Sequence, residues 1–247
     1  MALNVAAAVA VALCLAAPRH LPGQAPAAPI RDNSFLIEEA YNQDRNMVQH
    51  ISTFSDTRTA VWAFGFTDEW PVDGVRNQVS VGATLVDNSA AGEFSVFAFN
   101  YRRQLVGHPD AAVIVSPRLS FFADVGSAGR SPYALQVNVP VTAVLSDALV
   151  SHWNLGGTLG AGPALVNVGA SLVWLALPWM NFLAEGLLVG AAGEAPTYVV
   201  SPGVRWAFSV GVVQVVPGIA FPLDIQRQDD DAIFLYLSFE HPFGPTD

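Results

Sequence analysis

Apolar and polar side chains alternate with a period of two residues along most of the chain, from about residue 47 to residue 243. At positions 133–142 the odd residues are Tyr, Leu and Val, whereas the even residues are Ala, Gln, Asn, Pro and Thr. At positions 78–85, Val, Ala and Leu alternate in the same way with Gln, Ser, Gly and Thr. Successive side chains of a β-strand point to opposite faces, so this pattern predicts strands with one apolar and one polar face.

The alternating segments are each about ten residues long, and Gly, Pro, Asp, Asn and Ser separate them, as is typical of turns. They predict about twelve strands, an even number, as in single-chain bacterial barrels. The expected strands cover residues 47–55, 60–68, 77–86, 94–104, 113–124, 133–145, 149–159, 164–176, 179–190, 197–208, 211–222 and 232–243. Short turns are expected at one end, near 146–147, 177–178 and 209–210, and longer loops at the other, near 126–130, 193–196 and 224–231.

The two faces of these strands differ in a way that indicates a membrane protein. The apolar face carries large and aromatic residues, and the polar face carries mainly Gly, Ser, Asn and Gln. A soluble β-sandwich would instead turn a face rich in Lys, Glu and Thr toward water. We therefore expect an all-β fold, a closed antiparallel transmembrane β-barrel of up-and-down topology, with large side chains toward lipid and small polar ones in a narrow lumen.

The strongest competing interpretation is a transmembrane helix over residues 169–193, where the hydropathy is high. This segment contains Pro178, Asn181 and Glu185. A lone Glu is costly within a hydrocarbon core. In a β-hairpin, by contrast, Pro178 lies at the turn and both polar residues face the lumen, so the hairpin is favoured.

Composition supports a membrane barrel and argues against a nucleic-acid partner. Hydrophobic residues make up 52% of the 247 residues, charged residues only 13%, and the mean hydropathy is +0.38. The net charge is −10 and the sequence contains no Lys, whereas binding of a phosphate backbone needs a basic surface. The adjacent pair Arg102 and Arg103 is interpreted as the polar edge of a strand or turn.

Four regions are expected along the chain. Residues 1–27 resemble a secretory signal peptide, with a short apolar run and a small-residue cleavage pattern at 25–27, although no basic residue precedes the run. Residues 28–46 are expected to form a periplasmic N-terminal segment with a brief helix-compatible pattern, residues 47–243 the outer-membrane β-barrel, and residues 244–247 a C-terminal tail. The sole cysteine, Cys14, lies in the leader, so the mature chain has no disulfide or thiol nucleophile.

No catalytic, cofactor or metal site is expected in this chain, and we expect it not to be an enzyme. Inward-facing charged and polar side chains could set the electrostatic field of the lumen or pair with one another to fill it. The lumen-facing candidates are Arg118, Arg205, Glu185, Glu240, His152 and Asn154.

A lipid hydrolase remains an alternative because His50 and Ser52 lie two positions apart and so share one face of a strand. Some outer-membrane phospholipases and lipid A deacylases use such a pair, with His as the base for a Ser nucleophile. No orienting acid can be assigned from the sequence. A structural barrel that does not conduct is a further alternative.

Several motifs together resemble the outer-membrane transporter family named after the meta-pathway of phenol degradation, across nearly all of the mature chain. The motifs are residues 32–44 with 48–51, Ser116-Pro117-Arg118-Leu119-Ser120, residues 136–141, His152-Trp153-Asn154-Leu155-Gly156, residues 201–206, Pro217-Gly218 and residues 236–243.

This resemblance implies an outer-membrane channel or transporter for small solutes, hydrophobic or aromatic ones among them. Its partners would be outer-membrane lipids, a small solute of unknown identity and the outer-membrane assembly machinery, which would read the last strand with its Phe239 and Phe243. The segment 121–126 departs from the turn that the family would have after residue 120, which leaves that loop undefined.

Overall fold

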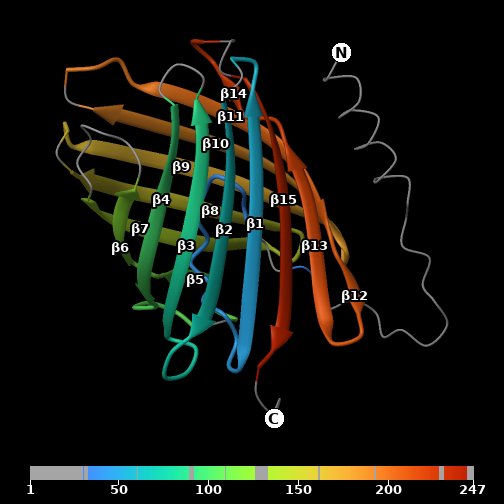
Figure 1. Cartoon of the computed structure of the whole chain (residues 1–247). Coiled ribbons are helices and arrows are strands. Elements are labelled where there is room, and N and C mark those ends of the chain that lie inside the picture. The colour runs from blue at the N-terminus through green and yellow to red at the C-terminus, as the bar shows by residue number, and fades with distance from the viewer. Residues whose placement is uncertain are drawn as a thin grey trace.

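The computed structural model describes residues 30, 33–59, 61–88, 92–108, 110–125, 133–160, 162–191, 193–227 and 231–243. Within these ranges the chain is a single antiparallel sheet that closes on itself as a twelve-stranded barrel, which confirms the expected fold class. The barrel closes where β1 pairs with β15, and Figure 1 shows these first and last strands side by side. The signal peptide expected at 1–27 and the tail at 244–247 lie outside the described residues.

Each barrel strand pairs with its neighbours along the chain, as up-and-down topology requires. The barrel strands are β1 (Met47–Thr57), β2 (Val61–Pro71), β3 (Asn77–Asn88), β4 (Gly92–Arg103), β6 (Arg118–Val125), β7 (Tyr133–Ser146), β8 (Leu149–Leu159), β9 (Leu165–Leu177), β10 (Met180–Ala191), β11 (Thr197–Trp206), β13 (Val213–Ala220) and β15 (Ala232–Pro242).

Three short strands continue barrel strands beyond a break and keep their register. They are β5 (Val113–Val115) on β7, β12 (Phe208–Val210) on β13, and β14 (Leu223–Asp224) on β11. Pro117 and Pro222 interrupt two of these runs because proline has no N–H to donate to the ladder. The third breaks at Ala207, whose N–H donates instead to the carbonyl of Trp179 at 2.8 Å.

These breaks correct three of the expected strands. The strand expected at 113–124 is interrupted between β5 and β6. The strand expected at 197–208 ends at Trp206 and continues as β12, and the strand expected at 211–222 ends at Ala220 and continues as β14. The alternation of side chains continues across each break, so the sequence pattern alone does not reveal them.

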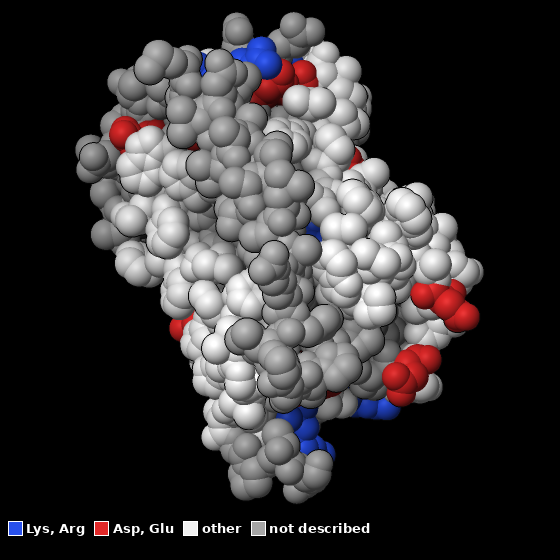
Figure 2. Space-filling model, turned by 90° about the vertical axis from the view of Figure 1, so that its right-hand side faces the viewer, with Lys and Arg blue, Asp and Glu red and all other residues white. Residues whose placement is uncertain are grey.

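Side chains alternate between the lumen and the outer surface as expected. Large apolar side chains, including Phe97, Leu135 and Trp153, are exposed on the outside, whereas Gln78, Asn138 and other polar side chains are buried. In Figure 2 the described wall is mostly free of charged side chains, which lie in small groups near its margins. An apolar belt of this extent needs lipid to cover it, so the outer surface is that of a membrane-embedded barrel.

The two ends of the barrel differ in their connections. At one end, here called the turn end, β1 begins and β15 ends, and links of two residues join β7 to β8, β9 to β10 and β12 to β13. The opposite end, the loop end, carries the links 126–132, 192–196 and 225–231. The turn end also carries two longer links, 72–76 and 104–117, the second of which includes β5, so the expected asymmetry between short turns and long loops holds only for the second half of the chain.

The hairpin interpretation of residues 169–193 is confirmed, because β9 and β10 cover most of this segment and Pro178 lies in the link between them. In the described parts of the chain, no helix is long and apolar enough to cross a membrane.

The N-terminal segment does not lie in the periplasm as expected: residues 33–46 lie inside the barrel and contain no helix. Ile37 and Ala40 are fully enclosed, and wall side chains bind the backbone N–H groups that a helix would pair with its own carbonyls. At the turn end, the N–H of Met47 donates to the carbonyl of Asp44 at 3.1 Å and Asn46 has a φ of 61°, a tight turn that leads the chain from the lumen into β1.

The lipid-facing wall makes a depth-dependent prediction. Leu155 lies well inside β8 and is 60% exposed, and Leu159 is the last residue of β8 and is 65% exposed. We expect Leu155→Arg to lower the free energy of unfolding in lipid vesicles by about 2–4 kcal/mol and Leu159→Arg by about 1 kcal/mol or less, because a charge is costliest at the bilayer centre. Chemical denaturation of both variants measures this, and equal costs would contradict the membrane placement.

Candidate functional site

The lumen and the segment 33–46 inside it form the candidate functional site, and all six lumen-facing candidates lie there. Glu185, His152, Asn154 and Arg205 are buried in the wall, whereas Arg118 and Glu240 are partly buried. Glu185, Asn154 and Arg118 contact the segment directly, and Arg205 and Glu240 line a cavity beside it. We call residues 33–46 the plug segment.

Glu185 on β10 holds the start of the plug segment by its backbone. One carboxylate oxygen, Oε1, accepts the N–H groups of Phe35, Leu36 and Ile37 at 3.0, 2.9 and 3.1 Å. Consecutive N–H groups that converge on one point form an anion-binding concavity. Hydrogen bonds to a charged group contribute about 1.5–3 kcal/mol each, so Glu185 is a principal anchor of the plug segment.

Glu38 provides a second anchor through its own carboxylate. Its Oε1 accepts from Nη1 of Arg102 at 3.2 Å, and its Oε2 lies 3.3 Å from Nη1 of Arg118 and accepts from Nδ2 of Asn138 at 2.8 Å. Arg102 and Arg118 are directly paired residues of β4 and β6. Like charges placed opposite each other on adjacent strands destabilise a sheet, so Glu38 offsets the repulsion between the two guanidinium groups.

Two further wall side chains bind the backbone of the plug segment. Asn154 accepts from the N–H of Glu38 at 2.8 Å and donates to the carbonyl of the same residue at 2.7 Å, as a neighbouring β-strand would. Thr142 accepts from the N–H of Ala40 at 2.9 Å, and its hydroxyl lies 2.8 Å from Nδ1 of His152. The plug segment therefore keeps its backbone paired although it belongs to no sheet.

Apolar contacts depend on wall positions that lack a side chain. The ring of Phe35 packs against Phe234 and Tyr236, and a Cβ on Gly203 or Gly218 would lie 2.7 or 2.6 Å from it. The wall is thus shaped to accommodate this ring.

Glu39 lies beside the same arginine cluster and precedes the first strand. Its carboxylate lies 4.0 Å from Nη1 of Arg102. Burial raises its pKa to about 7, and the charge of Glu69 adds to this effect, while the attraction of Arg102 opposes it. Glu39 therefore titrates near neutral pH.

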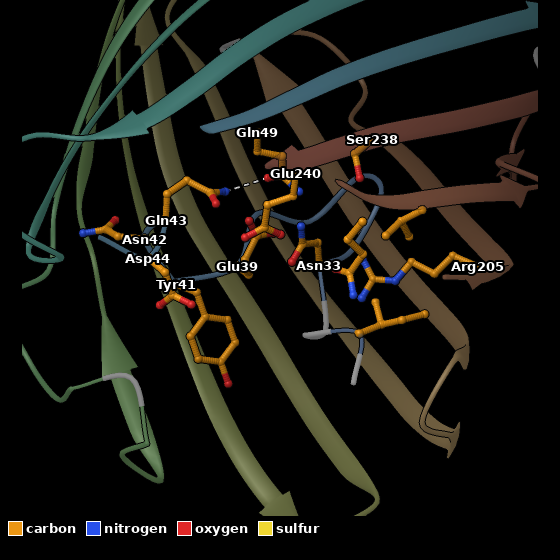
Figure 3. A pocket seen from close by; sticks show the side chains of 13 residues that line it. Asn33, Glu39, Tyr41, Asn42, Gln43, Asp44, Gln49, Arg205, Ser238 and Glu240 are labelled. Carbon is orange, nitrogen blue, oxygen red and sulfur yellow. Dashed lines mark hydrogen bonds between the residues drawn. The ribbon is translucent and has the colours of Figure 1, made fainter. Parts of the chain in front are cut away.

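The plug segment lies between two cavities of the lumen. The inner cavity, of about 360 Å³, is lined by Gln49, Arg205 and Glu240 at the turn end, and Figure 3 shows Arg205 reaching toward Asn33 there. The outer cavity, of about 430 Å³, includes Arg118 and Thr158 on the side of the loop end. Asn33 and Glu39 of the plug segment line both cavities, so this segment separates them.

The hydrolase pair does not form. His50 and Ser52 lie on the outer face of β1, and the ring nitrogens of His50 contact Asp68 and His241. Neither nitrogen is therefore turned toward the Ser52 hydroxyl, as a general base would be.

Glu38 and Arg102 were not among the sequence-based site candidates. Arg102 had been interpreted as the edge of a strand or turn, but it is buried in the lumen. The sequence did contain a signal for this: Arg102 lies two residues after Asn100 in β4, so the two side chains share the inward face of the strand. Nothing in the local pattern around Glu38 indicates its partners, which lie 64 and 100 positions away.

Comparison with known proteins identifies the fold. No family model matches the sequence, and no curated protein matches it. Among solved structures, the chain is similar to the KdgM porin (TM-score 0.55, 6% identity, 80% of this chain and 99% of that chain) and to the NanC porin (0.57, 4%, 79% and 100%). It is also similar to the COG4313 outer membrane channel from Pseudomonas putida F1 (0.53, 10%, 83% and 98%).

The fold is that of an outer-membrane β-barrel. These likenesses do not show the narrower phenol-degradation family expected from the motifs, and at such low identity they carry no information about a solute. With the apolar outer belt and the closed sheet, they agree with the outer membrane as the location of the barrel.

The anchor at Glu185 can be tested by hydrogen exchange. We expect Glu185→Gln to speed exchange of the amides of Phe35, Leu36 and Ile37 by about tenfold to a hundredfold, because the neutral amide is a weaker acceptor than the carboxylate. Mass spectrometry of peptides covering 33–41 measures it. Glu194→Gln, an exposed change in a link at the loop end, is the matched control. Unchanged exchange in the Glu185 variant would refute the anchor.

The raised pKa of Glu39 predicts a pH dependence of docking. The group binds a proton more tightly when docked, with a pKa of about 7, than at its ordinary value of 4.5 when released. Lowering the pH from 8 to 6 should therefore favour the docked plug segment by about tenfold. Hydrogen exchange at both pH values, corrected for intrinsic rates, measures this preference, and Glu39→Gln should remove most of the difference.

Proposed function

We propose that this protein is an outer-membrane channel for small solutes whose lumen is closed by its own plug segment. The observation that carries the proposal is a polar lumen divided into two cavities by a segment outside the sheet. A wall of Gln, Asn, Ser and Arg side chains suits water and dissolved solutes. The channel-like role also agrees with the porins and channels that share the fold.

The plug segment can leave without disrupting the barrel, because no barrel strand depends on it for a ladder hydrogen bond. It is bound largely by side chains such as Glu185, Asn154 and Thr142, and the barrel closes through β1 and β15 without it. Water could replace these polar contacts one by one. Release of the segment would join the inner and outer cavities into one path.

Release would also change the charge of the path. Glu38 would leave Arg102 and Arg118 without their bridging carboxylate, so that Arg102 would keep only Glu69 of β2, 3.9 Å away, and Arg118 would be free to bind an anion. Paired guanidinium groups bind carboxylates well, so the open lumen should favour small carboxylate-bearing solutes. The family resemblance implies hydrophobic or aromatic solutes. An aromatic carboxylate such as benzoate has both an aromatic ring and the carboxylate that the two arginines would bind, so this class of solute fits the proposal.

A disulfide lock tests the proposal directly. Oγ of Ser34 in the plug segment lies 2.7 Å from Oγ of Ser171 on β9, and residues 28–247 contain no cysteine. In planar bilayers we expect the chain lacking residues 33–44 to conduct several-fold more than the wild type. The oxidised S34C/S171C variant should be closed and should regain wild-type conductance on reduction, whereas the single cysteine variants should not respond.

The controls separate three outcomes. Silence of both the wild type and the deletion variant, with chloride, acetate and benzoate salts, would show a structural barrel that does not conduct and would refute the channel. Undiminished conductance in the oxidised variant would show that solutes pass beside the segment and would refute the plug. Equal conductance for acetate and benzoate would contradict a preference for aromatic solutes.

A further inference from the structure

A group of titratable side chains lies outside the lumen, at the seam where the barrel closes. His50 belongs to β1, Asp68 to β2 and His241 to β15. His50 is paired in register with Phe239, which is exposed on the outer surface, and His241 lies two residues beyond Phe239 on the same face. The group therefore lies on the outside of the wall, near the turn end.

The partners of the two imidazole rings assign their protonation. Nδ1 of His50 contacts a carboxylate oxygen of Asp68, and Nδ1 of His241 lies 3.1 Å from the carbonyl oxygen of Pro242. Carboxylates and carbonyls only accept hydrogen bonds, so each Nδ1 carries the proton. In the neutral rings both Nε2 atoms are then unprotonated and present a lone pair.

These two lone pairs face each other. The Nε2 atoms are 3.1 Å apart, closer than the ring centroids at 5.2 Å. Two neutral acceptors at this distance repel, and a cation or a shared proton between them would remove the repulsion. Zinc binds imidazole nitrogen at about 2.0–2.1 Å, which places two ligands of one tetrahedral ion about 3.3 Å apart. The observed separation is close to that value.

We propose that His50 and His241 bind one divalent transition-metal ion of the Zn²⁺, Ni²⁺ or Cu²⁺ class across the closing seam. Imidazole nitrogen is a preferred ligand of these ions. Hydrogen bonding of the outer ring nitrogen to a carboxylate or carbonyl is the arrangement that orients metal-binding histidines. Within the described ranges no three His, Cys, Asp or Glu residues converge as ligands, so two positions remain open to water.

The ion would crosslink the first and last strands of the barrel. Its ligands are 191 positions apart in the sequence, and it would add a crosslink to the β1–β15 ladder and to the ion pair of Arg58 with Asp231 (3.6 Å) at the loop end of the same seam. A ligand that binds the closed barrel and not the unfolded chain stabilises the closed state, by an amount that grows with the logarithm of the ratio of its concentration to its dissociation constant. The site therefore couples metal binding to barrel stability.

The test uses the untagged barrel folded in detergent, because a histidine tag would itself bind the probe. We expect isothermal titration with ZnCl₂ or NiCl₂ to show one site. Saturating metal should raise the unfolding temperature, and EDTA should reverse this increase. H50A and H241A should each lose both effects. D68N should weaken binding by about 10–100-fold, because it removes the orienting carboxylate. H108A, which changes an exposed histidine away from the seam, is the matched control and should match the wild type.

Two results would overturn the proposal. The first is the absence of saturable metal binding in the wild type, or binding that survives in both H50A and H241A. The second is a nitrogen-15 NMR signal for a proton shared between the two Nε2 atoms that metal does not displace, which would make the pair a protonated hydrogen-bonded unit. H241Q removes the imidazole but keeps a polar side chain of similar size, so it separates loss of the metal ligand from loss of folding. The heat-dependent mobility of the barrel on gels shows whether each variant is folded.

Discussion

Within a bilayer every backbone N–H and C=O needs a partner inside the protein, because hydrocarbon offers none. Closure of the sheet satisfies this requirement for the twelve barrel strands, and the pairing of β1 with β15 is the step that removes the last open edge. The alternation of large outward and small inward side chains follows from closure, because one face then meets lipid and the other a narrow lumen. The lumen in turn provides the polar wall on which the plug segment depends.

The same requirement explains how an irregular segment can lie at membrane depth. Non-helical backbone is tolerated there only where protein or water surrounds it. In this barrel, side chains on the inner wall take the role that a neighbouring strand would have. Glu185 binds three consecutive N–H groups, and Asn154 pairs with both the N–H and the carbonyl of Glu38. The wall is specific for this segment, because glycines leave room where Phe35 packs.

The sequence predicted the barrel well, because a period of two is a local signal that repeats in every strand. It placed the hairpin turn at Pro178 and the start of β1 at Met47 for the same reason. The plug segment could not be predicted in this way. Its position depends on contacts such as that of Glu38 with Arg102, which join distant parts of the chain, and its own pattern is too short to indicate a structure. The break at Pro117 was visible as a proline, but the continued alternation hid its effect.

The packing of Phe35 has a consequence for the order of assembly. The surfaces that receive its ring belong to β11, β13 and β15, which are the last barrel strands in the chain. These surfaces do not exist until the C-terminal strands have joined the sheet. Phe35 precedes every strand in the sequence, yet its ring can reach its final position only after these strands are in place, and the lumen stays unobstructed by this ring until the barrel is nearly complete.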